Sequence, residues 1–176
     1  MTACGAGPCP AAGALAELLV ETGRVVAQLT TEAYAAPGVP RISGSIGGHV
    51  RHCLDHVLAL ERALETGEVD YDERRRHTEV ERDRELAVIA LAAAARRLEQ
   101  IEDAALDRPL AVRSCIAPDG RSVRGRSSVA RELAFVISHT IHHHAQIALL
   151  ADRLGACRLP TRFGLAHSTP NPAGAA

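Results

Sequence analysis

The chain has 176 residues, the length of one domain rather than two. Its residues are 47% hydrophobic, yet only four are aromatic and alanine dominates, which favours closely packed helices over a β-sandwich. None of the 20 basic residues is a lysine, which excludes Schiff-base chemistry, and the net charge of −1 argues against a dedicated nucleic-acid or anionic-membrane binder.

The chain carries no pattern of export or membrane insertion. Its first twenty residues lack the basic and apolar regions of a signal peptide, and no stretch reaches the roughly 18 apolar residues of a membrane span. The five cysteines are irregularly spaced and odd in number, as is typical of reduced thiols. We therefore expect a cytoplasmic protein without a membrane segment.

The first half of the chain predicts two helices. Helically spaced leucines and valines indicate the first over about 11–34, and two prolines then break the chain. The second helix begins at a serine cap, either Ser43 or Ser45. It continues to about residue 65, where Gly67 ends it.

The second half predicts two more helices with an insert between them. Thr78 starts the third in a capping-box pattern, and its apolar spacing continues to about residue 102. In residues 107–126, apolar residues alternate with polar or small ones near a Pro-Asp-Gly turn, and this pattern predicts a small β-hairpin. The fourth helix continues from a serine cap at 127 or 128 to Gly155.

These elements predict an all-α fold, a four-helix bundle with a small β-hairpin insert between helices three and four. We place the bundle domain at residues 10–160. The ends, 1–9 and 168–176, are expected to be flexible because they are rich in small residues and proline.

Seven of the nine histidines fall in two clusters, one on the second predicted helix and one on the fourth. On the second helix, His49, His52 and His56 span only about 60° of the helix circumference. On the fourth helix, three histidines share one face with Gln146, whereas His144 points away. The three are His139, His142 and His143.

A polar stripe that faces a bundle core is costly unless its imidazoles are hydrogen-bonded or bind a metal. One histidine of the second helix, together with His139 and His143, would form a three-histidine site. Such a site has an open coordination position, which is typical of catalytic metal sites. Imidazoles suit zinc, nickel, iron or copper, and the pattern does not choose among these metals. The spare histidines, His49 or His142, are candidates for moving protons.

The segments S-I-G-G-H-V-R-H and H-T-I-H-H-H-A-Q resemble the DinB/YfiT-like metal-binding superfamily over roughly residues 10–155. The resemblance implies that His52, His139 and His143 hold the metal. His144 stands where the family usually has arginine, and Ala145 where it has glycine.

A narrower resemblance, to an uncharacterised DinB-like subgroup, rests on Y-D-E-R-R-R before the third helix and on F-G-L-A-H-S-T near the end. In the first segment, Tyr71, Arg74 and Arg76 are candidates to bind an anionic small-molecule substrate, since arginine forks bind carboxylate and phosphate groups. The alternative is a solvated charged loop. The second segment is either a lid over the site or an ordinary packed tail.

The resemblance implies a metal-dependent enzyme, a thiol-dependent transferase, an isomerase or a hydrolase, with zinc, nickel or iron and a low-molecular-weight thiol as cofactor. His49 and His142 are then the catalytic residues. A non-catalytic metal-binding or stress-response protein is the alternative, and a non-haem iron oxidase is a further one. The resemblance also implies a homodimer.

Overall fold

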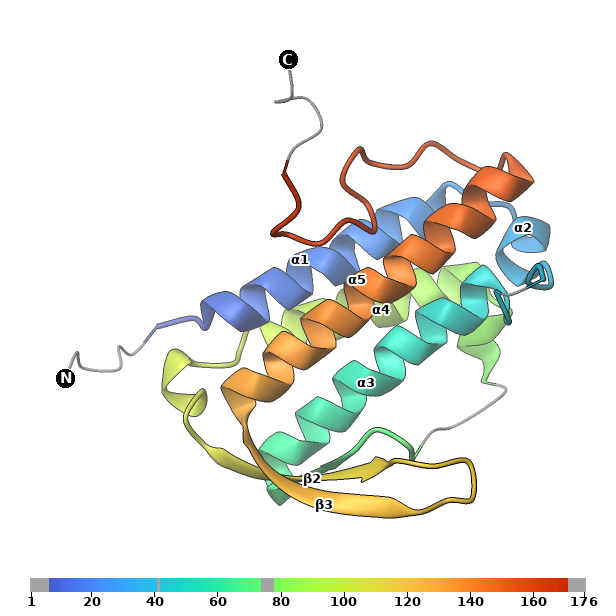
Figure 1. Ribbon diagram of the computed structural model, residues 1–176. Coiled ribbons are helices and arrows are strands. Elements are labelled where there is room, and N and C mark those ends of the chain that lie inside the picture. The colour runs from blue at the N-terminus through green and yellow to red at the C-terminus, as the bar shows by residue number, and fades with distance from the viewer. Residues whose placement is uncertain (1–6, 41, 74–77, 171–176) are drawn as a thin grey trace.

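The computed structural model describes residues 7–40, 42–73 and 78–170, and this part of the chain is mostly helical (Figure 1). It contains five α-helices and a three-stranded sheet. The helices are α1 (Pro10–Ala27), α2 (Thr31–Ala35), α3 (Ile46–Thr66), α4 (Arg84–Leu98) and α5 (Val129–Leu154). The strands are β1 (Glu68–Asp70), β2 (Pro109–Cys115) and β3 (Ser122–Ser128), and two short 3-10 turns are η1 (Glu79–Glu81) and η2 (Asp103–Ala105).

The four long helices lie alongside one another (Figure 1). Both α1 and α3 pack against α4 and α5. Among the described residues, no helix is both long and apolar enough to span a membrane.

Local caps fix the positions of α3 and α5. The hydroxyl oxygen of Ser45 accepts a hydrogen bond from an amide in the first turn of α3, and Ser128 does the same for α5. Gly67 and Gly155 end these helices with φ values of 77° and 58°, a left-handed conformation that glycine adopts without strain. The two helices that carry the histidine clusters therefore begin and end close to where the sequence predicted.

Two other helix boundaries differ from expectation. The first helix ends at Ala27, and Thr30 then caps the separate short helix α2. Thr78 makes no side-chain cap, and α4 begins only after Asp83, whose carboxylate accepts two amide hydrogen bonds in the first turn. In both cases a polar side chain further along the chain supplies the cap, so the helix starts there.

The sheet has the order β1-β2-β3. The antiparallel pair of β2 and β3 lies between α4 and α5 in the chain, where alternation predicted a hairpin. Strand β1, which follows α3 directly, joins β2 in parallel and was not expected. Three residues are too few for alternation to reveal a strand.

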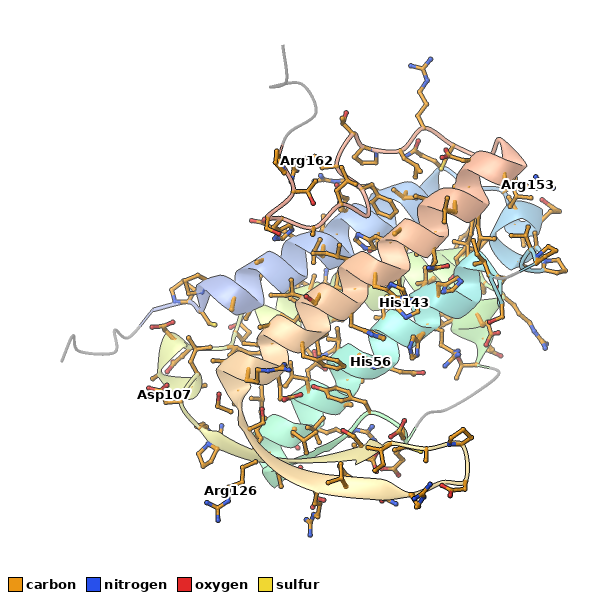
Figure 2. All side chains as sticks on the ribbon, viewed as in Figure 1. His56, Asp107, Arg126, His143, Arg153 and Arg162 are labelled. Atoms are coloured by element: carbon orange, nitrogen blue, oxygen red, sulfur yellow. The ribbon has the colours of Figure 1, made fainter. Side chains whose placement is uncertain are left out.

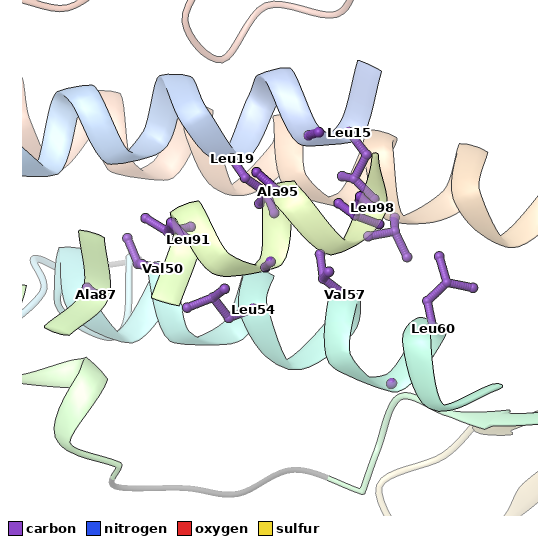
Figure 3. Close-up of a cluster of buried hydrophobic side chains, with 14 of the residues drawn as sticks. Leu15, Leu19, Val50, Leu54, Val57, Leu60, Ala87, Leu91, Ala95 and Leu98 are labelled. Atoms are coloured by element: carbon purple, nitrogen blue, oxygen red, sulfur yellow. The ribbon is translucent and has the colours of Figure 1, made fainter. Parts of the chain in front are cut away.

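The core is built mainly from leucine, valine and alanine (Figure 3). Leu15 and Leu19 from α1 meet Leu91 and Leu98 from α4, and all four are fully buried. Alanines between them, such as Ala95, allow the backbones to approach closely. The low aromatic content is thus compatible with a dense interior.

The S-I-G-G motif has a packing role at the start of α3. A Cβ atom on Gly47 would lie 2.1 Å from the carbonyl oxygen of Glu81 and 2.8 Å from the ring of Tyr34. The Tyr34 hydroxyl donates a hydrogen bond to the Val80 carbonyl at 2.8 Å. Gly47 therefore allows α2 and η1 to pack against the end of α3 that carries His49.

The predicted flexible ends are described only in part, because residues 1–6 and 171–176 lie outside the described residues. The amide of Cys9 donates to the carbonyl of Ile101 at 3.0 Å, and its side chain is buried and caps α1. Residues 7–9 are therefore attached to the rest of the fold.

Candidate functional site

The two histidine clusters meet across the interface between α3 and α5. Figure 2 shows His56 of α3 and His143 of α5 between these two helices. Ring contacts link the clusters, with centroids 4.9 Å apart for His52 and His139 and 5.1 Å apart for His49 and His143. The helical phasing of both clusters therefore brings them to a common interior surface.

One group of three imidazoles has ligand atoms close enough to hold a metal ion. It consists of His52, His56 and His139, whose ligand atoms all lie within 4.8 Å of one another. The Nε2 atoms of His52 and His139 are 3.0 Å apart. Two nitrogens that bind one ion tetrahedrally at about 2.0–2.1 Å lie about 3.3 Å apart, so this spacing fits a shared ion.

The tautomer of His56 is fixed by its own helix. Its Nδ1 lies 3.0 Å from the carbonyl oxygen of His52, one turn earlier, and a carbonyl only accepts, so Nδ1–H is the donor. The lone pair of the neutral ring is then on Nε2. A histidine that donates through one ring nitrogen while the other faces its neighbours is prepared to bind a metal.

His143 and His49 form a second pair beside this group. Their Nδ1 atoms are 2.9 Å apart, and both side chains are buried. The His143 ring is 4.6 Å from those of both His52 and His139, centroid to centroid. His142 is exposed, with its ring 5.2 Å from that of His143.

Both members of the buried pair favour the neutral form. Burial, and then the charges of the imidazoles around it, lower the pKa of His143 to about 2. Burial, followed by the nearby His142, also lowers the pKa of His49. Neutral imidazole is the form that binds metals, so these rings have available lone pairs at neutral pH.

The structure thus brings together the three residues that the family resemblance assigned to the metal. His52 and His139 belong to the group with convergent ligand atoms, while the third member of that group is His56 rather than His143. The assignment of His143 as a ligand stays a prediction. His56 lies four residues after His52 on the same face, and this spacing was the available signal for it.

Tyr71 borders the histidine group from the connection after β1. Its ring is nearly parallel to that of His56, at 8°, with centroids 4.9 Å apart. Its hydroxyl donates to Glu132 at 2.9 Å, and Ser127 donates to the other carboxylate oxygen at 2.6 Å. Burial and the Glu132 carboxylate raise the pKa of Tyr71 above its ordinary value, so the hydroxyl stays protonated.

Sequence reasoning placed Tyr71 in a substrate-binding segment but missed its partner, since Glu132 lies on α5, 61 positions further along the chain. The other two predicted substrate-binding residues, Arg74 and Arg76, lie outside the described residues. The role predicted for this segment in binding an anionic substrate stays a prediction.

His144 faces away from the histidine group, as its helical phase predicted. It is 1% exposed, and its Nε2 lies 2.6 Å from the Thr22 hydroxyl oxygen on α1. Thr22 donates its own proton to the carbonyl of Leu18, so it accepts from the Nε2–H of His144. Burial lowers the pKa of His144 to about 4.

The C-terminal segment packs on this second face. Phe163 stacks on His144, with ring centroids 4.2 Å apart and planes 12° apart. Gly164 has a φ of 81°, and a Cβ there would lie 2.7 Å from the backbone of Ala145. The F-G-L-A-H segment is therefore a packed tail here, because it covers His144 rather than the metal candidates.

Comparison with known proteins identifies the family and a similar fold. A model of the DinB family matches residues 20–172, and the chain therefore belongs to the DinB family. It is similar in fold to a DinB-like protein, YjoA, of Bacillus subtilis, with a TM-score of 0.57 and 19% identity over 83% of this chain and 94% of that one.

The chain is also similar to FK506-binding protein 5 of Rhizopus delemar, with 35% identity over 102 residues. This similarity covers 57% of the chain and 26% of the Rhizopus protein. The chain therefore spans about a quarter of the length of that relative.

Proposed function

We propose that this DinB-family chain is a metal-dependent enzyme that holds a divalent ion between α3 and α5. The observation that carries the proposal is the group of His52, His56 and His139, with ligand atoms within 4.8 Å of one another. A three-histidine set leaves a coordination position open for substrate or water. Zinc, nickel and iron all accept such a set.

The architecture that we propose is the DinB-like four-helix bundle, formed by α1, α3, α4 and α5, with the β2–β3 hairpin as its insert. The packing of α1 and α3 against both α4 and α5 supports this description. In such bundles, side chains from facing helices supply the metal ligands, as the histidines of α3 and α5 do here.

The chemistry that such an ion supplies is Lewis-acid activation of a bound water, thiol or carbonyl group. His142, His143 and His49 form a continuous series of imidazoles from the solvent to the interior. A neutral imidazole can relay a proton by accepting it at one ring nitrogen while donating another from the second, and we propose that His142 and His49 carry protons to and from the site in this way.

The proposed substrate is a small anionic molecule, with a low-molecular-weight thiol as a second reactant in a transferase or isomerase reaction. We place the substrate beside the histidine group. Tyr71 supports this placement because its ring stacks against His56 and because Arg74 and Arg76 follow it closely in the sequence. We further propose a cytoplasmic homodimer.

A non-catalytic metal-binding protein is the second candidate, favoured by the presence of more histidines than one ion requires. Titration of the Co²⁺-loaded protein with a small thiol distinguishes the enzyme from the non-catalytic metal-binding protein. An open position gives a thiolate-to-cobalt charge-transfer band in the near ultraviolet, and His52→Ala abolishes it. A wild-type cobalt spectrum that does not change with thiol would contradict the enzyme proposal in its thiol-dependent form.

A further inference from the structure

A cleft of about 460 Å³ opens between α1, α5 and the C-terminal tail, residues 156–170, and the proposed function does not use it. The tail runs back beside these two helices (Figure 1). It contributes Gly164, Leu165 and His167 to the wall of the cleft, and α5 contributes Ile141 and His144. Because His144 faces away from the histidine group, the cleft is separate from the proposed metal position.

One nitrogen of the His144 ring borders this cleft without a hydrogen bond to any described residue, although the side chain is 99% buried. The Nε2–H of the ring donates to Thr22, so the lone pair of the neutral ring is on Nδ1. Nδ1 lies 4.0 Å from Oε2 of Glu21 on α1, which is longer than a hydrogen bond. Two acceptors therefore face each other, and a group with two N–H donors would satisfy both of them.

The charged groups around the cleft favour a positive occupant. Three carboxylates and two guanidinium groups border it, those of Glu17, Glu21, Glu99, Arg24 and Arg162. The Arg162 guanidinium is directed at the tail itself, where it donates to the carbonyls of Ala166 and Thr169 at 3.3 and 2.9 Å. Burial raises the pKa of Glu21 despite the positive groups nearby, so a further cation would stabilise its ionised form.

We propose that this cleft binds a small organic ammonium ion with an apolar body. The ammonium group would donate to Nδ1 of His144 and to the carboxylate of Glu21, since each is an acceptor facing the cleft. The body would lie against Leu18, Ile141 and Leu165, which supply apolar surface beside these groups. The volume of the cleft is in the range of small-molecule sites, and the proposal does not depend on the metal.

A bare metal ion is a poorer occupant than an organic cation. His144 and Glu21 supply two ligand atoms, whereas metal sites in proteins usually have at least three protein ligands. Within the described ranges, the set of three ligand groups that lie within 4.8 Å of one another is the one between α3 and α5. An ammonium ion needs only hydrogen-bond acceptors and a negative surrounding, and the cleft has both.

The experiment is a calorimetric titration with benzylamine, which is a cation at neutral pH, and with benzyl alcohol, which has the same shape and no charge. We expect one equivalent of benzylamine with a Kd below about 1 mM, and at least about tenfold weaker binding of the alcohol. Glu21→Gln should weaken benzylamine binding at least about tenfold, because it removes the charge. Glu85→Gln on α4, 79% exposed and outside the cleft, is the matched control and should bind as the wild type.

Two further measurements locate the amine. The ¹⁵N resonance of His144 Nδ1, assigned through its absence from His144→Gln, should shift as benzylamine binds to the wild type. The double variant with His52→Ala and His139→Ala should bind benzylamine with unchanged affinity, because an amine can also coordinate a metal. Loss of binding in this variant would overturn the cleft and leave the metal site intact.

The remaining outcomes are equally decisive. Equal binding of amine and alcohol, an unchanged affinity in Glu21→Gln or a stationary His144 resonance would each overturn the proposal. Failure of the wild type to bind metal would overturn the proposed function alone, since the amine would still bind at the cleft. Selective binding of the amine that Glu21→Gln weakens and the double variant keeps supports the ammonium site.

Discussion

The ring of Tyr71 lies against the ring of His56, with the two planes 8° apart and the centroids 4.9 Å apart. The hydroxyl of Tyr71 is held by Glu132, which is buried and also receives a hydrogen bond from Ser127. Glu132 of α5 therefore supports the orientation of His56 on α3 indirectly, through the ring of Tyr71, which belongs to neither helix. A ligand ring held in this way loses less freedom when a metal binds.

Removal of the Tyr71 ring should weaken metal binding more than removal of its hydroxyl. Tyr71→Phe keeps the ring against His56 but leaves Glu132 with one partner fewer, so the unfolding free energy should fall by about 1 kcal/mol. Tyr71→Ala also removes the packing surface and should lower metal affinity. Urea unfolding and chelator competition measure the two effects. Equal metal affinity in Tyr71→Ala and the wild type would contradict this role.

Substitution of His52 should distinguish it from His49. His52→Ala removes a member of the three-histidine group and should lower the affinity for the metal ion at least about tenfold. His49→Ala should keep that ion but lose activity or substrate binding. Competitive chelator titration of both variants provides the comparison. If His49→Ala loses the metal ion while His52→Ala retains it, the assignment is wrong.

The pH dependence of stability should report on His144, which lies away from the metal candidates. Its pKa is lowered from 6.5 to about 4 in the folded protein, so the unfolded chain takes up the proton first. The contribution of His144 to stability is therefore complete above about pH 6.5 and decreases by about 3 kcal/mol as the pH falls to about 4.

His144→Gln tests this prediction in the metal-free protein, because glutamine does not titrate. The variant should be less stable than the wild type at neutral pH, and the difference should shrink as the pH falls. After reconstitution with metal, the variant should hold as much metal as the wild type, since His144 faces α1. A stability difference that stays constant between about pH 7 and about pH 4.5 would contradict the assignment.

Much of this site could be predicted from the sequence because helical phase is a local property. Spacing of three and four residues placed His49, His52 and His56 on one face, and it placed His144 on another. Helical phase does not specify the axial offset between two packed helices. It therefore could not decide whether His56 or His143 is the third member of the group that contains His52 and His139. That choice depends on the packing of α3 against α5.

Contacts between distant segments account for the other differences. The Tyr71–Glu132 hydrogen bond joins residues 61 positions apart, and neither side chain has a pattern that indicates the other. Strand β1 exists because it pairs with β2, not because Glu68–Asp70 alternates. The end of α1 before Thr30 could not be recognised from the sequence, because the buried Leu29 continues the apolar spacing of that helix.

Self-association is expected from the family resemblance. Sedimentation at tens of micromolar should show a species of roughly twice the 18.6 kDa chain mass. The same measurement on the metal-free protein should give the same mass, because the histidine group lies inside one chain. A monomer at that concentration would contradict the dimer.

The central claim, that the histidines of α3 and α5 hold a divalent metal, is tested most directly by metal content. The protein is purified without nickel resin, reconstituted with zinc, nickel or iron, and measured by elemental analysis. We predict at least one equivalent per chain for the wild type, and a loss of that ion when His52 and His139 are both replaced by alanine. Less than about 0.2 equivalents in the reconstituted wild type would contradict the account, since a preformed three-histidine site should outcompete buffer.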